Sequence, residues 1–150
     1  MNDTSPWHNK KILIVDDSAL IRNQLRTLYA SLGLEIVGEA GDGLAAIEKF
    51  KDVRPDIVSL DIIMPYMHGF DCHRKLKKLD ANLHTVFVSC LAHEAITSEL
   101  LQEEFNPNLF ATKPATLESL EKVLSFCLGV PIEQPSLGDV SPAARVPSVS

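Results

Sequence analysis

Cysteine is scarce in this 150-residue sequence, and the three present, Cys72, Cys90 and Cys127, form no C-x-x-C pair. A disulfide framework or a zinc ribbon needs more cysteines at closer spacing, so neither is expected. No apolar run approaches the roughly 20 residues that cross a bilayer, and the first residues lack the apolar core of a signal peptide. We therefore expect a cytoplasmic protein with no membrane partner.

Positive charge is also scarce, because 14 Lys and Arg face 20 Asp and Glu and the formal net charge is −6. Binding to a nucleic-acid backbone depends on clustered cations, so no nucleic-acid partner is expected. The one basic cluster, at residues 74–78, indicates a solvent-exposed helix face. Phosphate-binding glycine loops are absent too, since neither G-x-G-x-x-G nor G-x-x-x-x-G-K-[ST] follows a predicted strand. This argues against a nucleotide- or flavin-binding domain.

The two ends of the chain differ in composition from its middle. Residues 131–150 contain four Pro, four Ser and no aromatic residue, a composition that does not repay the entropy of ordering a chain. We predict a disordered Pro/Ser-rich tail over 130–150 and a flexible N-terminal arm over 1–9, in which Trp7 can pack locally. Residues 10–129 then form one domain, long enough to bury a core of its own.

Short apolar runs rich in β-branched residues alternate with helical patterns along this domain. The first helical pattern has Ser18 as its capping residue and ends at Gly33, a residue that favours helix termination. Strict alternation of nearly all-apolar strands with helices predicts an α/β fold, a doubly wound parallel sheet with helices on both faces. The expected strands are residues 12–15, 35–37, 57–60, 86–88 and 108–111, and the later helices are residues 43–51, 69–79, 94–105 and 116–128.

Polar residues stand where the predicted strands end. Asp16 and Asp17 follow the first strand, Asp61 follows the third, Ser89 ends the fourth and Lys113 follows the fifth. Ligands of open α/β sheets bind at this edge, so the five side chains are expected to converge. Three close carboxylates need a cation, and oxygen ligands suit Mg²⁺. A carboxylate beside Mg²⁺ and a lysine can attack a phosphoryl group, although any single Asp would more simply be a cap or turn residue.

Several stretches resemble the receiver domain of two-component response regulators. They are ILIVDDS at 12–18, Asp42-Gly43 with Ala46, DIVSLDIIMPYMHG at 56–69, VFVS at 86–89 and Lys113-Pro114. The resemblance extends over about residues 11–128, and in size the chain is similar to a stand-alone receiver of the chemotaxis-regulator type. It implies a five-stranded, flavodoxin-like sheet of order 2-1-3-4-5 and a cis peptide bond before Pro114.

The resemblance implies that Asp61 accepts a phosphoryl group from a phosphohistidine on a sensor histidine kinase or phosphotransfer protein. Asp17 and Asp61 would bind Mg²⁺ together with the backbone carbonyl of Ile63, and Asp16 would act at the metal through a water or a hydrogen bond. Lys113 would pair with a phosphoryl oxygen.

The resemblance also implies a switch. Ser89 would hydrogen-bond another phosphoryl oxygen, and Phe110 would turn inward behind the moving hydroxyl or serve as ordinary core packing. The change would reach a downstream target protein through a surface made by the helix at 94–105, the strand at 108–111 and the helix at 116–128.

By the same resemblance, we expect two apolar positions in this chain to control water access to the phosphoryl group. Side chains two residues beyond the phosphoacceptor and two beyond the switch hydroxyl often orient or exclude water in this family, and here they are Ile63 and Leu91. Neither accepts a hydrogen bond, so slow self-dephosphorylation is expected. Cys90 stands where a very small residue is usual and would narrow the access.

Two further positions depart from the family pattern. His68 stands where Asp is usual, and we expect an exposed loop residue there. Asn106-Pro107 replaces Gly-Ala before the fifth strand. Asn tolerates the left-handed conformation at a helix end, so that geometry is expected to persist.

The leading hypothesis is a single-domain response regulator, monomeric or weakly dimeric, that catalyses only its own Mg²⁺-dependent phosphorylation and dephosphorylation. An aspartyl-nucleophile phosphatase is one alternative, but it needs a second carboxylate where Ile63 stands. A receiver-like scaffold that is never phosphorylated is another, and the complete set of strand-end residues argues against it. The sequence names neither the kinase nor the target.

Overall fold

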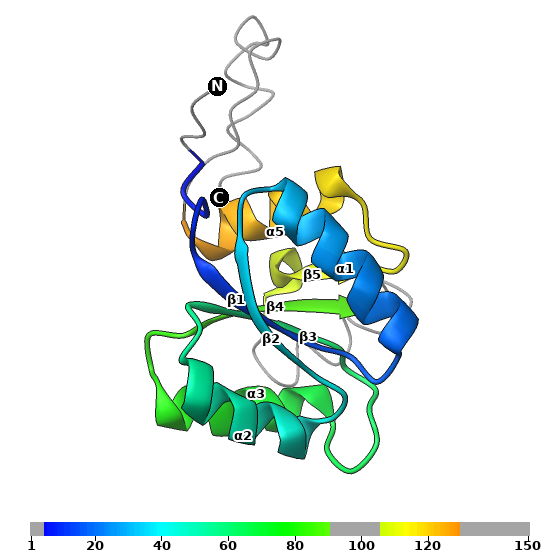
Figure 1. Ribbon diagram of the computed structural model, residues 1–150, viewed down its shortest axis with the longest axis vertical. Coiled ribbons are helices and arrows are strands. Elements are labelled where there is room, and N and C mark those ends of the chain that lie inside the picture. Colours follow the sequence, from blue (N-terminus) through cyan, green and yellow to red (C-terminus); the bar gives the residue numbers. More distant parts are fainter. Residues whose placement is uncertain (1–4, 91–105, 130–150) are drawn as a thin grey trace, which may run out of the picture.

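The computed structural model describes residues 5–90 and 106–129, which contain a five-stranded parallel sheet (Figure 1). The strand order is β2-β1-β3-β4-β5, so the predicted α/β class and topology are confirmed. The order reverses between β1 and β3, which is where ligands of such sheets bind. The strands are β1 (Lys11–Val15), β2 (Glu35–Ala40), β3 (Ile57–Leu60), β4 (His84–Ser89) and β5 (Phe110–Thr112).

Helices cover both faces of the sheet, two on each in the described part of the chain (Figure 1). One face carries α1 (Ala19–Ser31) and α5 (Leu117–Cys127), and the other carries α2 (Gly43–Val53) and α3 (Gly69–Leu79). The predicted helix at 94–105 lies outside the described residues, as does Leu91. No described helix is both long and apolar enough to cross a membrane.

The apolar runs are continuous because each central strand is buried on both sides. Successive side chains of a strand point to opposite faces. In β1, Ile12 and Ile14 therefore join the core beneath α1 and α5, whereas Leu13 and Val15 join the core beneath α2 and α3. All four are fully buried, so both cores fix the register of β1 and with it the position of the residues that follow.

Local capping chemistry sets the helix ends, and those of α1 are as predicted. The Ser18 hydroxyl accepts from the backbone N–H of Ile21 at 3.2 Å, and Gly33 follows α1 with φ 96°. At α5, Thr116 and Ser119 exchange side-chain and backbone hydrogen bonds in a capping box. The carboxyl edge of the sheet is therefore joined to α1 by a short, well-defined turn.

The segment before β5 differs from the prediction. A 3₁₀ helix, η1 (Pro107–Leu109), occupies the first two residues of the expected strand at 108–111, and β5 begins at Phe110. Asn106 is extended at φ −89° rather than left-handed, and its side chain accepts from the Asn108 N–H. The cause is Pro107, because the ring of a proline pushes the preceding residue toward extended conformations.

Trp7 is part of the core and not of a loose arm. Its side chain is buried, and its indole N–H donates to the Leu32 carbonyl at 2.9 Å. Asn9 also donates its N–H to the Gly33 carbonyl at 2.7 Å. The predicted arm over 1–9 is therefore wrong for Trp7 to Asn9, whereas the local packing of Trp7 is confirmed.

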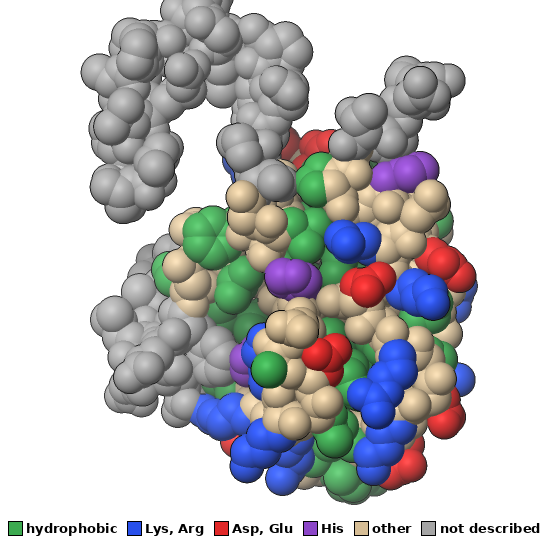
Figure 2. Space-filling model, turned by 90° about the vertical axis from the view of Figure 1, so that its left-hand side faces the viewer, with side chains coloured by type: hydrophobic (Ala, Val, Ile, Leu, Met, Phe, Trp, Pro, Cys, Tyr) green, Lys and Arg blue, Asp and Glu red, His purple; other side chains and the backbone are tan. Residues whose placement is uncertain are grey.

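The basic cluster at 74–78 lies in the C-terminal half of α3. Lys and Arg side chains gather on the lower part of the face in Figure 2. Arg74 and Lys75 are exposed, as predicted. Lys77 instead donates to the carbonyls of Ala81 and Leu83, both at 2.8 Å. Positive charge is favourable at this end of a helix, so this part of the cluster has a structural role.

Candidate functional site

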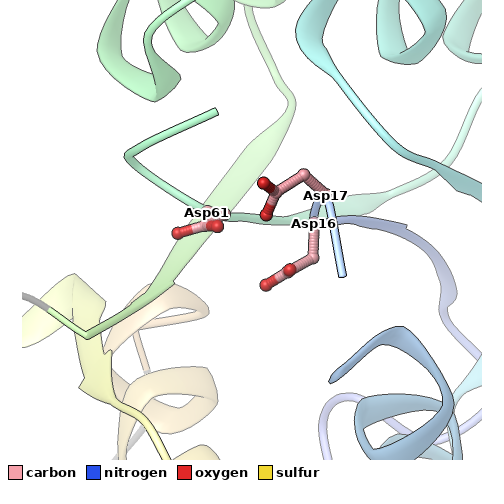
Figure 3. A group of neighbouring side chains, drawn as sticks. All are labelled: Asp16, Asp17 and Asp61. Atoms are coloured by element: carbon pink, nitrogen blue, oxygen red, sulfur yellow. The ribbon is translucent and has the colours of Figure 1, made fainter. Parts of the chain in front are cut away.

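Three carboxylates meet at the carboxyl edge of the two central strands (Figure 3). Asp16 and Asp17 directly follow β1 and Asp61 directly follows β3, and each group has an oxygen within 4.8 Å of the others. The Asp61 N–H donates to the Val15 carbonyl at 3.0 Å, so the parallel ladder brings the two strand ends together. Asp16 and Asp61 are buried, whereas Asp17 is exposed.

Lys113 lies against two of these carboxylates. Its Nζ is 2.6 Å from Asp16 Oδ2 and 3.2 Å from Asp61 Oδ2. The Lys113 N–H donates to the Ser89 carbonyl at 2.8 Å, which ties the end of β5 to the end of β4. The peptide bond between Lys113 and Pro114 is cis, as the resemblance implied. The five residues predicted at the strand ends therefore share one edge.

The charges of the cluster favour the binding of a cation. Burial, together with the nearby charge of Asp16, raises the pKa of Asp61 above its ordinary value, although Lys113 opposes the shift. Burial lowers the pKa of Lys113, but its contacts with Asp16 and Asp61 outweigh burial and raise it overall. One ammonium cannot neutralise three carboxylates, and a hard, oxygen-only donor set suits Mg²⁺. The residues present therefore fit this ion.

An open cavity of about 220 Å³ adjoins the cluster. Its lining comes from the ends of β1, β3, β4 and β5 and consists of Asp17, Asp61, Ile63, Ser89, Cys90 and Lys113. Since a water occupies about 30 Å³, the cavity has space for several waters or for a hydrated ion and a phosphoryl group. Ile63 is 56% exposed at this cavity, and Cys90 is exposed beside Ser89.

Phe110 packs against the core next to the site. Its ring stacks on Phe87 with centroids 4.6 Å apart and meets Phe70 edge-on at 6.0 Å. Phe87 is buried in β4, two residues before Ser89, which is itself 1% exposed. The packing role of Phe110 is confirmed. Its role as a moving part remains a prediction.

His68 is not simply an exposed loop residue, contrary to prediction. It is half-buried and caps α3, where its Nδ1 accepts from the Phe70 N–H at 3.2 Å. A helix begins there because an acceptor side chain satisfies an otherwise unpaired N–H, and the imidazole nitrogen takes the part usually played by Asp or Ser. The cap keeps α3 directly behind the loop that carries Ile63.

Two residues that support the acidic cluster were not predicted. A Cβ added to Gly69 would lie 2.2 Å from the Asp61 carbonyl oxygen, so only glycine fits behind the phosphoacceptor candidate. Arg22 donates from Nη1 to the Asp16 carbonyl at 2.5 Å. A contact with a backbone atom cannot be predicted from residue types, because every residue has the same backbone atoms. For Gly69, however, the position of a glycine just after the Asp61 loop could have indicated close packing there.

The sequence is similar to those of known proteins over most of its length. The family described as the response regulator receiver domain matches residues 12–125. The chain belongs to the response regulator receiver family. This receiver is 36% identical to the chemotaxis protein CheY of Thermotoga maritima over 118 residues, which is 76% of this chain and 97% of that protein. It is 33% identical to CheY of Bacillus subtilis over 119 residues, 77% of this chain and 98% of that protein.

Solved structures agree with this membership. A chain in the crystal structure of the CheX-CheY-BeF3-Mg²⁺ complex from Borrelia burgdorferi is 33% identical to this receiver, with a TM-score of 0.69 and coverage of 79% of this chain and 90% of that one. The response regulator domain of Thermotoga maritima CheB is 32% identical, with a TM-score of 0.64 and coverage of 83% and 100%. The receiver is therefore of the CheY-like type.

Proposed function

We propose that this receiver is a single-domain response regulator that accepts one phosphoryl group on Asp61. The donor would be a phosphohistidine on a sensor histidine kinase or phosphotransfer protein. The observation that carries the proposal is the position of Lys113, whose Nζ contacts both Asp16 and Asp61 beside the cavity. A carboxylate with an ammonium on one side and two acids on the other has the surroundings that phosphoryl transfer requires, which are chiefly positioning and charge neutralisation.

Asp16, Asp17 and Asp61 would hold Mg²⁺ with the backbone carbonyl of Ile63. The bound ion would neutralise charge on the acids and on the incoming phosphoryl oxygens. An Asp61 carboxylate oxygen then forms a bond to phosphorus as the P–N bond of the donor breaks, and the donor imidazole leaves with the electron pair. Lys113 stabilises a phosphoryl oxygen as a point charge, which its nearly buried side chain, 10% exposed, is placed to do.

The proposed output is a change of protein-binding surface. The Ser89 hydroxyl would bond a phosphoryl oxygen, and Phe110 would follow it, altering β5, α5 and the segment at 94–105 that a target protein contacts. In this proposal the protein works in the cytoplasm as a monomer or weak dimer, without a nucleic-acid or membrane partner. Its only catalysis is its own phosphorylation and dephosphorylation.

The test is labelling with a small phosphodonor, read by intact mass. With Mg²⁺ present, the wild-type protein should gain one phosphoryl group and Asp61→Asn should gain none, because an amide is a far weaker nucleophile. Asp71→Asn is the control, since Asp71 is exposed on α3 and pairs with Arg74. Equal labelling of wild type and Asp61→Asn would show that the acceptor is another residue. No labelling of the wild type would favour the unphosphorylated scaffold.

A further inference from the structure

Arg22 connects three elements that meet behind the acidic cluster. It lies in the second turn of α1, and its side chain is only 20% exposed. Its Nη1 donates to the Asp16 carbonyl at 2.5 Å, while its Nε donates to Glu39 Oε1 at 3.1 Å. Glu39 belongs to β2, directly beside Ile14 of β1 in the ladder. The guanidinium therefore bridges α1, β2 and the turn that follows β1.

The anchored carbonyl belongs to the peptide group that joins Asp16 to Asp17. A peptide group is planar, so fixing the carbonyl direction also fixes the start of Asp17. The N–H of Asp16 donates to the Ala40 carbonyl at 3.1 Å, and Asp16 Oδ1 accepts from the Ser18 N–H at 2.9 Å. The backbone of Asp16 is thus held on both sides, and Arg22 supplies the bond on the side that leads to Asp17.

The direction of these bonds matters for a cation site. A guanidinium paired with the Asp16 or Asp17 carboxylate would compete with a metal ion for the same oxygens. Arg22 instead bonds the Asp16 carbonyl, and Glu39 lies against it as a counter-charge. Arg22 therefore does not compete with a cation for the carboxylate oxygens of the acidic pair, and Glu39, which Arg26 shares, reduces the repulsion between Arg22 and an incoming cation.

We infer that Arg22 is a positioning residue for the acidic pair, which orients the Asp16–Asp17 peptide group so that both carboxylates face a divalent cation. This inference rests on the Mg²⁺ site of the proposed function. This role requires the planar guanidinium, whose N–H groups donate in two directions, to Glu39 and to the Asp16 carbonyl. A lysine has the same charge, but its single ammonium cannot span both acceptors in the same way.

The sharpest test is Arg22→Lys, with Arg26→Lys as the matched control. Arg26 lies one turn further along α1 and also pairs with Glu39, but its side chain is 47% exposed. Both substitutions keep the net charge and change a partner of Glu39. Mg²⁺ binding by calorimetry should weaken about tenfold in Arg22→Lys, the lower end of the effect seen when partners of metal ligands are removed. Arg26→Lys should bind as the wild type does.

A second measurement needs no metal. Hydrogen exchange at the Ser18 amide, which bonds Asp16 Oδ1, should be several-fold faster in metal-free Arg22→Lys than in wild type or Arg26→Lys. If Arg22→Lys does not fold, Glu39→Gln takes its place in this exchange measurement with the same expectation, because a neutral amide in place of the carboxylate weakens the other end of the bridge.

Unchanged exchange at Ser18 would overturn the inference, and so would equal Mg²⁺ affinities for Arg22→Lys and wild type. An equal loss in Arg22→Lys and Arg26→Lys would also overturn it, since the effect would then belong to Glu39 in general. Failure of wild-type protein to bind Mg²⁺ would instead contradict the proposed function, and faster exchange at Ser18 would still support the anchoring role of Arg22.

Discussion

Ile63 places an exposed apolar side chain at the cavity beside Asp61, where the proposed function needs a hydrolytic water to approach. Because isoleucine offers water no hydrogen bond, we expect it to shield a phosphoryl group on Asp61. We expect Ile63→Asn to shorten the lifetime of phosphorylated protein by up to ~100-fold, the lower range for a positioned polar group. Mg²⁺ affinity should persist, since the proposed ligand at this position is the backbone carbonyl. The loss of phosphate after removal of the donor measures the lifetime.

The matched control is Tyr66→Asn on the same loop. Tyr66 is 84% exposed with φ 71°, a conformation that asparagine tolerates well, and it is not part of the cavity lining. It should leave the lifetime unchanged. A wild-type lifetime of seconds, or no response to Ile63→Asn, would mean that Leu91, Cys90 or loop motion controls water access.

Gly69 supports Asp61 from behind. Its N–H donates to the Ile62 carbonyl at 2.7 Å, and an added Cβ would lie 2.2 Å from the Asp61 carbonyl oxygen and 2.7 Å from Ile62 Cα. Gly69→Ala should therefore displace the acceptor loop, slow phosphorylation at saturating Mg²⁺ and destabilise the fold by about 1–3 kcal/mol, as overpacking does. Urea unfolding and the labelling rate measure the two effects.

Gly41→Ala is the control for Gly69→Ala, because its added Cβ would meet Arg22 at an ordinary contact distance of 3.5 Å. It should change stability and labelling little. If Gly69→Ala matched this control in both measurements, the loop would have enough freedom to accommodate a methyl group, and the close packing behind Asp61 would not matter for function.

At the scale of elements, strand ends and helix caps could be predicted, because they depend on the types of the residues at those positions. Apolar runs end where Asp16 and Asp61 begin, and Ser18 and Thr116 cap the helices that follow. The conformation at Asn106 was mispredicted because the steric effect of the following proline outweighed the tolerance of asparagine for a left-handed backbone. The Arg22 bridge could not be predicted, since its acceptor at Asp16 is a main-chain carbonyl.

β5 and α5 are the elements in which we expect the largest change on phosphorylation. Ser89 ends β4 and Phe110 begins the neighbouring strand β5, where its ring stacks on Phe87 of β4. A movement of the Ser89 hydroxyl therefore has to be accommodated between these two strands. Hydrogen exchange with and without beryllofluoride and Mg²⁺ should show altered protection in β5 and α5. The far end of α1 serves as the internal reference, and changes confined to α1 would contradict this expectation.

For the whole molecule, the clearest pH dependence comes from His73 on α3. Its Nδ1 and Thr85 Oγ1 share a hydrogen bond at 3.0 Å, and its ring meets Phe87 at 5.6 Å. Burial, with smaller effects from Lys77 and Arg74, lowers the pKa of His73 from 6.5 to about 4. The folded protein therefore resists protonation of this ring more strongly than the unfolded chain does.

The sign follows from this difference. The contribution of His73 to the free energy of unfolding is fully present above pH 6.5 and falls as the pH drops toward 4, because the unfolded chain takes up the proton first. The ring is only partly buried, so we expect a loss of about 1–2 kcal/mol after allowing for solvent screening. In urea unfolding at pH 7 and pH 5, His73→Gln should lose less stability than wild type. An equal loss in both proteins would assign the effect to other groups, such as His84.

The single tryptophan stands at the opposite end of β1 from the acidic cluster. Its indole is buried and hydrogen-bonded to Leu32, so its emission depends on whether the sheet and α1 remain packed together. A fluorophore there is insulated from ions and phosphate at the other edge. Tryptophan fluorescence consequently reports whether the protein is folded and does not respond to ligand binding at the acidic cluster. A variant that alters the site without unfolding the protein will keep the wild-type spectrum.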